Sequence, residues 1–239
     1  MQRNSLVNSL GLFSLLAITS VVRGGIIVDH QPTLGGGLAA DTDFVTDTGY
    51  PNYWQLVADD FLLSSPATVG HIVFWGFYGG TFGGNPNPPN GSETIRIRFY
   101  DARPGDALPG NVLYEENLLN PSRVWTGAYV DIAHPQFRFE SDLPTPASFS
   151  ANTRYWLEVV QLGIPDSEFR WEFSPSDGTY LADANPAFPN WQIVGPDPLP
   201  NNAFQLWDTP EPDSLALVFL GIGAGIARRS GLGTAHPTT

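Results

Sequence analysis

The sequence of 239 residues contains no cysteine and no lysine. The absence of cysteine excludes a disulfide framework and any thiolate chemistry, so packing alone must hold the fold together. All eleven basic residues are arginine and stand against 24 acidic residues, which gives a formal net charge of −13. Charged residues make up only 15% of the chain, below the usual quarter. This negative field argues against nucleic acid and anionic lipid as partners.

Helical periodicity is almost absent between residues 25 and 208. Short apolar or alternating runs replace it, as in the stretch where Ile95, Ile97 and Phe99 alternate with arginines. Such runs lie at residues 25–30, 54–63, 68–78, 94–100, 112–116, 124–132, 136–139, 153–162, 169–173 and 203–207. Turn signals lie at 103–106, 108–110, 120–122 and 177–178. About ten short strands predict an all-β domain, an antiparallel β-sandwich of jelly-roll type.

The N-terminus has the three parts of a secretory signal peptide. Arg3 provides a positive start, residues 10–18 form an apolar stretch, and Val22-Arg23-Gly24 offers small residues around a cleavage site. We therefore expect residues 1–24 to direct export and to be removed.

The C-terminus carries a second apolar segment. Pro210-Glu211-Pro212 ends the preceding domain, since proline continues neither a strand nor a helix interior. An apolar, glycine-rich run follows from Leu215 to Ala227, and the pair Arg228-Arg229 comes directly after it. This order predicts a transmembrane helix over about 214–227, with the arginines on the cytoplasmic side.

The order of these parts resembles the PEP-CTERM sorting signal of exported bacterial proteins, over residues 209–229. The resemblance implies that residues 209–239 form a sorting and anchor segment that a membrane-embedded exosortase reads and cleaves. It also implies transit through the inner membrane, followed by a place at the cell surface or outside the cell. The residues that carry the resemblance are Pro210, Glu211, Pro212, Arg228 and Arg229.

Residues 25–208 remain as one domain, large enough to bury a core. It holds seven arginines and 22 acids, so its formal charge is −15. The stretches 57–61 (VADDF), 97–110 (IRFYDARPGDALPG) and 155–157 (YWL) resemble uncharacterised exported sandwich domains that often precede PEP-CTERM tails. That resemblance supports the fold and implies no reaction, because no catalytic residues are established for the group.

Asp41, Asp43 and Asp47, with Asp59 and Asp60 downstream, are candidate calcium ligands. Calcium prefers several oxygen ligands on flexible loops, although the spacing does not match the EF-hand pattern. The alternative is that these acids are solvated and cap turns. Calcium is the only cofactor that the sequence suggests.

Trp75 and Tyr78 are candidate glycan-binding residues. They precede a long loop, 79–92, rich in glycine, proline and asparagine, and sugar rings stack on tryptophan and tyrosine. A period of two puts the two rings on opposite faces of a strand, and Tyr78 borders the loop. The alternative is that both rings pack in the core.

No catalytic motif stands out. Glu168 and Glu172 are four residues apart, which would place them on one strand face about 13 Å apart, outside the range for two-carboxylate glycoside hydrolysis. Glu158 could partner either of them across strands. The histidines lack metal-ligand spacing.

We therefore expect a non-enzymatic, exported surface or matrix protein, associated with extracellular polysaccharide. One alternative is a purely structural, self-associating matrix protein. The other is a polysaccharide-active hydrolase that uses Glu158, Glu168 or Glu172.

Overall fold

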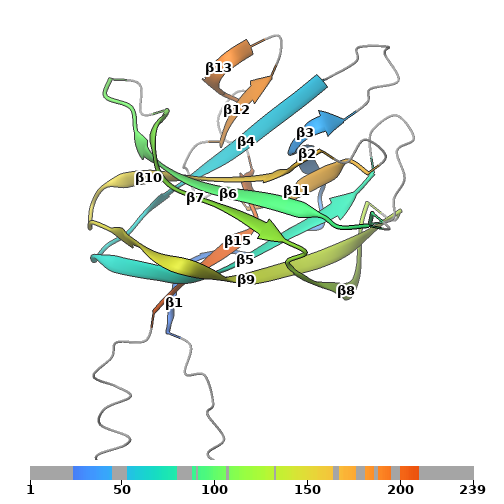
Figure 1. The fold of residues 1–239 in the computed structure, drawn as a ribbon, viewed down its shortest axis with the longest axis horizontal. Helices are drawn as coiled ribbons and strands as arrows, with labels where there is room; N and C mark the ends of the chain where they lie inside the picture. Colours follow the sequence, from blue (N-terminus) through green and yellow to red (C-terminus); the bar gives the residue numbers. More distant parts are fainter. Residues whose placement is uncertain are drawn as a thin grey trace, which may run out of the picture.

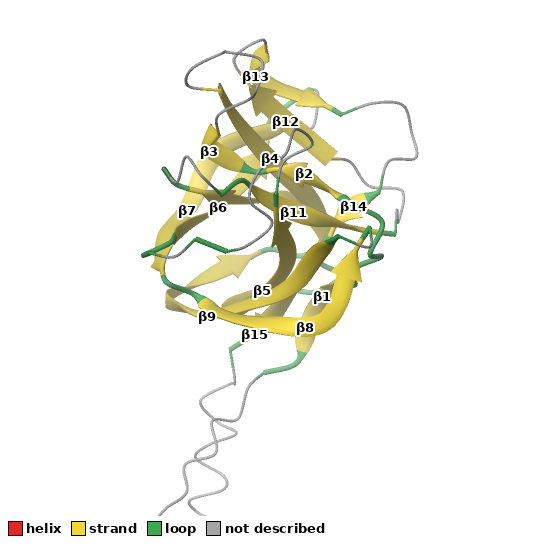
Figure 2. Cartoon of the chain, turned by 90° about the vertical axis from the view of Figure 1, so that its right-hand side faces the viewer, coloured by secondary structure: helices red, strands yellow, loops and turns green. Residues whose placement is uncertain are grey.

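The computed structural model describes residues 24–44, 53–79, 88–89, 91–105, 108–131, 133–163, 167–175, 181–185, 188–194 and 200–209. Every regular element within these ranges is a β-strand (Figure 2). None of these segments forms a helix long and apolar enough to cross a membrane. The predicted signal peptide, except for its last residue, and the predicted C-terminal helix lie outside the described residues.

The strands form two curled sheets, which is consistent with the expected β-sandwich (Figure 1). The first sheet has eight strands: β1 (Ile26–His30), β2 (Gly37–Ala39), β5 (Ala67–Tyr78), β8 (Ser122–Val130), β9 (His134–Phe149), β11 (Phe169–Ser174), β14 (Asn201–Asn202) and β15 (Phe204–Asp208). The second has seven: β3 (Asp41–Phe44), β4 (Tyr53–Leu62), β6 (Thr94–Ala102), β7 (Pro109–Leu119), β10 (Arg154–Gln161), β12 (Leu181–Asn185) and β13 (Phe188–Ile193).

Strand β5 is the centre of the first sheet. It pairs with β9 along one edge, while β15 and β11 follow one another along its other edge. Strand β8 pairs only with β9 among the described strands, so it forms the end of this sheet. In the second sheet, β10 lies between β4 and β6, and β7 is the terminal strand beyond β6. All pairings are antiparallel except a single parallel contact between β3 and β10.

The core lies between the sheets and is rich in aromatic rings. Phe61 of the second sheet meets Phe204 of the first with ring centroids 6.4 Å apart, and Phe74 stacks on Phe139 at 4.9 Å. The alternation predicted for β6 is confirmed, because Ile95, Ile97 and Phe99 are fully buried while the arginines between them lie on the other face. Hydrophobic burial of this kind is the main term that stabilises the fold.

The structure corrects the predicted strand limits in two places. Residues 108–110 were expected to form a turn, but β7 begins at Pro109, where proline is tolerated because it is the first residue of the strand. The run at 136–139 extends to Phe149, through Pro144 and Pro146. Beyond Glu140, β9 pairs with β5 but no longer with β8, so these prolines lie on an edge strand.

The first and last strands of the domain lie together. β1 and β15 pair antiparallel from Ile26↔Trp207 to His30↔Phe204 (Figure 1). The chain segments before residue 24 and after residue 209 are therefore attached at neighbouring points of one sheet.

Candidate functional site

Both candidate glycan-binding rings are buried. The expectation that one of them, preferably Tyr78, faces a ligand is therefore wrong, and the alternative that both pack in the core holds. Tyr78 is 0% exposed and Trp75 is 7% exposed. The physical reason is that both faces of β5 are covered, since the Tyr78 ring contacts the rings of Phe137 and Phe169 and Trp75 lies in a second apolar cluster. Their placement on opposite faces is confirmed, since Tyr78 belongs to the core between the sheets and Trp75 packs with Val73 and Ala203. Residues 80–87 and 90 of the adjoining loop lie outside the described residues.

Tyr78 is held by a closed polar network. Its hydroxyl donates to Oε1 of Glu93, and Nη1 of Arg123 donates to the Tyr78 hydroxyl at 2.8 Å and to Oε2 of Glu93 at 2.7 Å. Nε2 of Gln161 donates to Glu93 Oε1 at 2.9 Å. Burial raises the pKa of both Tyr78 and Glu93. Because its groups satisfy one another, this network stabilises the interior and offers no open site.

The exposed aromatic side chains lie instead on β8. Among aromatic residues whose side chains the structure describes, Trp125 and Tyr129 stand out at 52% and 50% exposed. Their ring centroids are 6.0 Å apart with an interplanar angle of 73°. Large aromatic surface left in water by a folded domain is a marker of a binding surface.

Local backbone geometry explains why these two rings are together. The register between β8 and β9 shifts between Trp125 and Tyr129, and Gly127 has a φ of 86°, which favours glycine. The indole N–H of Trp125 donates to the carbonyl of Ala128 at 3.2 Å, and Thr126 Oγ1 donates to Oε1 of Gln136 at 2.6 Å. These bonds fix the bulge that carries the aromatic pair. Gly127 within a predicted strand was the sequence signal that could have revealed it.

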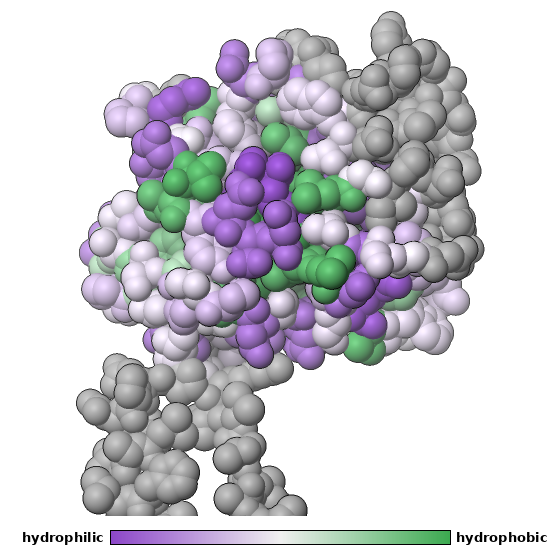
Figure 3. All heavy atoms as spheres, viewed as in Figure 1, coloured by the Kyte–Doolittle hydropathy of each residue, from purple (hydrophilic) through white to green (hydrophobic). Residues whose placement is uncertain are grey.

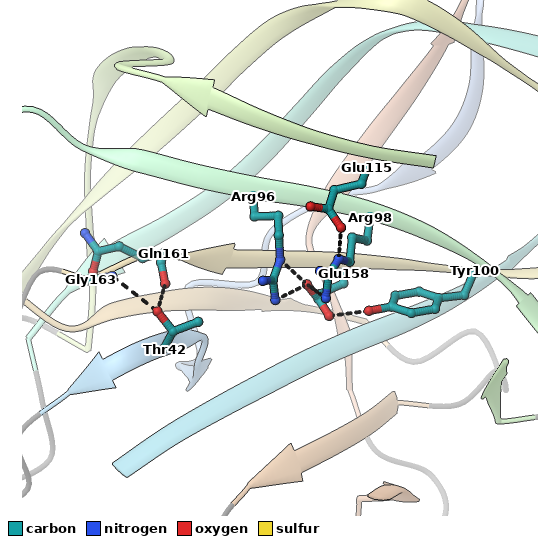
Figure 4. Close-up of polar contacts among 8 residues, drawn as sticks. All are labelled: Thr42, Arg96, Arg98, Tyr100, Glu115, Glu158, Gln161 and Gly163. Atoms are coloured by element: carbon teal, nitrogen blue, oxygen red, sulfur yellow. Dashed lines mark hydrogen bonds and ion pairs between the residues drawn. The ribbon is translucent and has the colours of Figure 1, made fainter. Parts of the chain in front are cut away.

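A charged network crosses the outer face of the second sheet (Figure 4). Oε1 of the fully buried Glu158 accepts hydrogen bonds from Arg96, and Oε2 accepts one from the Tyr100 hydroxyl at 2.6 Å. Arg98 Nε donates to Glu115 Oε2 at 2.6 Å, and Arg98 Nη1 lies 4.0 Å from Glu158 Oε1. Both Glu158 oxygens are occupied, so the network fastens β6, β7 and β10 together. Figure 3 shows a hydrophilic patch in the middle of the viewed face, with hydrophobic side chains around it.

The glutamates considered for hydrolysis are not brought together. Glu158 lies in the second sheet, whereas Glu172 lies in the first, where Gln136 and the backbone N–H of Leu34 donate to its carboxylate at 2.8 and 2.9 Å. Glu168 pairs with Arg170 at 2.7 Å. Burial raises the pKa of Glu168 and Glu172. The neighbours of Glu158 on β10 and of Glu172 on β11 point into the core, so these two acids lie on the outward faces of different sheets, and Glu168 directly precedes β11.

The calcium candidates do not gather within the described residues. Asp41 is buried in β3, Asp43 lies on the same strand, and Asp47 lies outside the described residues. Asp59 and Asp60 occupy opposite faces of β4, where Asp60 pairs with Arg154 at 3.0 Å. No group of three histidine, aspartate or glutamate side chains in the described part has metal-binding geometry. Calcium binding stays a prediction.

Comparison with known protein families identifies the family of this chain. Residues 31–212 match the family described as a domain of unknown function, DUF7901, and the chain belongs to that family. Among curated proteins, no relative matches the sequence.

Proposed function

We propose that this DUF7901 protein is an exported, non-enzymatic surface or matrix protein that binds extracellular polysaccharide through Trp125 and Tyr129. The observation that carries the proposal is the half-exposed pair of rings at 6.0 Å on an edge strand. Aromatic rings offer sugar CH groups a rigid apolar surface, and the Tyr129 hydroxyl adds a polar edge. The bulge holds the rings in place before binding, which lowers the ordering cost.

The charge of the domain narrows the ligand class. With −15 over residues 25–208, the protein disfavours anionic polymers at long range. We therefore assign neutral or cationic polysaccharide rather than an acidic one.

Export and sorting rest on the two ends of the sequence. The proposal is that residues 1–24 direct secretion, and that a jelly-roll-like sandwich follows over 25–208. An exosortase then acts at residues 209–239, with a helix over about 214–227 crossing the inner membrane in transit. Because β1 pairs with β15, both proposed signals adjoin the same end of the domain.

Pull-down on immobilised polysaccharides tests the binding proposal. The full-length protein should be retained by at least one neutral polysaccharide, and Trp125→Ala with Tyr129→Ala should abolish retention. Val124→Ala is the matched control, since Val124 is a neighbouring exposed side chain of the same strand. Retention by no polysaccharide, or equal retention of all variants, overturns the proposal.

A second candidate function is self-association through β8. Arg123 is the one charged residue of β8, and it forms an ion pair with Glu93. The strand therefore has no unpaired charge, and such charges are what normally prevent an edge strand from pairing with a strand of another molecule. Sedimentation across protein concentration separates the two functions, and Val124→Glu should abolish any association. A hydrolase has less support, because the described structure keeps Glu158 apart from Glu168 and Glu172.

A further inference from the structure

We propose that the ionisation of Glu172 regulates the aromatic pair on β8, through a hydrogen-bond relay that crosses the first sheet. This inference rests on the proposed function and adds its regulation by pH. The relay starts at Glu172 on β11 and runs through Gln136 on β9 to Thr126 on β8. It ends at the bulge that carries Trp125 and Tyr129.

The inner half of the relay is buried. Phe137 of β9 and Trp171 of β11 both pair with Gly76 of β5, so the residues beside them reach one another across that strand. Nε2 of Gln136 donates to Oε2 of Glu172 at 2.8 Å. Glu172 is 0% exposed and Gln136 is 4% exposed, so water competes little for this hydrogen bond.

The direction of every hydrogen bond in the relay is set by its two ends. At the inner end, the backbone N–H of Leu34 donates to Oε1 of Glu172 at 2.9 Å. An ionised carboxylate only accepts, so Gln136 turns its amide nitrogen toward Glu172 and its amide oxygen toward Thr126. At the outer end, Thr126 Oγ1 donates to that oxygen at 2.6 Å and accepts the backbone N–H of Ala128 at 3.2 Å. Each donor therefore meets an acceptor while Glu172 carries its charge.

Ala128 connects the relay to the aromatic pair. Thr126 points to the outer face of the sheet and Trp125 to the opposite face, so the two side chains do not meet. The N–H of Ala128 binds Thr126, whereas its carbonyl accepts the indole N–H of Trp125 at 3.2 Å. Gly127 precedes Ala128 at a φ of 86°, so both bonds act on one short bulge of backbone. A change at the Thr126 hydroxyl therefore moves the support of the indole ring.

Protonation of Glu172 reverses the requirement at the inner end. The new O–H needs an acceptor, but it faces the amide nitrogen of Gln136, which only donates. The conflict is removed when the Gln136 amide turns over, and its nitrogen then faces Thr126. Thr126 Oγ1 now accepts from two donors, and its own hydrogen is left with the backbone carbonyl of Gln136, which lies at 3.4 Å. The short hydrogen bond that closes the bulge is lost.

The surroundings of Glu172 set the direction of the pH effect. Burial raises the pKa of this carboxyl above 4.5, and the hydrogen bonds from Gln136 and Leu34 oppose the rise. Residues 31–36 and β2, which pack against Glu172, carry no charge, and Trp75 and Phe77 flank the relay on β5. The other charged groups of this face are paired within the described structure: Glu168 with Arg170, Arg138 with Glu140, and His134 with Asp131. The binding conformation is therefore lost as pH falls through the raised pKa of Glu172.

The indole N–H resonance of Trp125 gives a readout that needs no ligand. In the full-length protein it is assigned by its absence from Trp125→Phe. We expect its chemical shift to titrate with a midpoint above pH 4.5 and to stop titrating in Glu172→Gln. Glu168→Gln is the matched control and should still titrate. Burial raises the pKa of Glu168 as well, but this acid pairs with Arg170 outside the relay.

Calorimetry adds the affinity for a neutral oligosaccharide cut from the polysaccharide that the pull-down retains, a probe that carries no titrating group. Wild-type affinity should fall about fivefold once Glu172 is protonated, the effect of one hydrogen bond. Glu172→Gln should bind weakly at every pH. Thr126→Val should behave in the same way, and it carries the test alone if Glu172→Gln does not fold. Thr126→Ser keeps the hydroxyl and should behave like the wild type.

Several results overturn the inference and leave the proposed function standing. These are an indole shift that does not titrate, a titration that survives in both Glu172→Gln and Thr126→Val, and an affinity that stays constant across the titration while Trp125→Ala still weakens binding. Retention by no polysaccharide on the pull-down overturns the proposed function itself, and the regulation inferred from the relay falls with it.

Discussion

The carboxylate of Asp59 accepts a hydrogen bond from the backbone N–H of Asn202 at 2.6 Å, although the two residues come from different sheets. Asp59 is fully buried between the sheets, and this burial raises its pKa from 3.8 to about 7. His30 lies 3.6 Å from the same oxygen and opposes the rise. The interior therefore holds an acid that gains a proton near neutral pH.

This acid should make stability fall as pH rises. Between about pH 4 and pH 7 the folded state binds the Asp59 proton while the unfolded state has lost it, so the free energy of unfolding decreases across that window and levels off above it. Three pKa units correspond to about 4 kcal/mol as an upper limit. Urea unfolding at pH 5 and pH 8 measures the fall. Asp59→Asn should remove most of it, whereas Asp60→Asn, which breaks the Arg154 pair instead, should leave it in place.

Glu158 should be a stabilising residue. Its substitution Glu158→Gln leaves Arg96 without its buried counter-charge, and breaking such a pair costs about 3–5 kcal/mol. Denaturant unfolding should show this loss. Glu115→Gln should cost less than about 1 kcal/mol, because that pair with Arg98 is partly exposed. Equal losses for the two variants would contradict the assignment of Glu158 to the buried network.

The sequence predicted the strands whose pattern is local. β1, β4, β5, β6, β10, β11 and β15 lie close to the expected runs. It missed the short strands β2, β3, β13 and β14. It also missed β12, because the segment Leu-Ala-Asp-Ala-Asn has low strand propensity and is buried through tertiary pairing with β4. The sequence also predicted that the strand beginning near residue 136 ends at residue 139. It continues to Phe149, because Pro144 and Pro146, which usually indicate the end of a strand, are tolerated on its free edge.

The candidate site was harder to predict because exposure depends on topology. Alternation correctly separated the faces of Trp75 and Tyr78, but it could not reveal that β5 is central and β8 terminal. A tryptophan and a tyrosine three residues apart are core in β5, whereas a tryptophan and a tyrosine four residues apart are half-exposed in β8. Only the order of strands in the sheet distinguishes them.

The Pro-Glu-Pro element should govern processing. Changing Pro210, Glu211 and Pro212 together to alanine should leave the tail attached and the protein in the inner-membrane fraction. Intact-mass measurement of the secreted protein decides the matter. A mature form that retains residues 215–229 and is indifferent to the triple change would exclude exosortase processing.

If calcium binds the folded state and not the unfolded state, it should raise the melting temperature. At a free concentration 100-fold above the dissociation constant the gain is about 2.7 kcal/mol. The gain should vanish when Asp41, Asp43 and Asp47 are changed to asparagine. The same melting temperature for the wild type in millimolar calcium and in chelator would show that the folded protein does not bind calcium.

The most direct test of polysaccharide binding pairs affinity with melting for one substitution, Trp125→Ala. We predict that affinity for a retained neutral polysaccharide falls by at least about 1 kcal/mol, the scale of an aromatic contact, while the free energy of unfolding falls by no more than about 1.5 kcal/mol, the scale of the lost Trp125–Ala128 hydrogen bond. The buried control Trp75→Ala should instead lose about 3–5 kcal/mol of stability. Unchanged affinity in a folded Trp125→Ala protein would contradict the claim that this ring binds sugar.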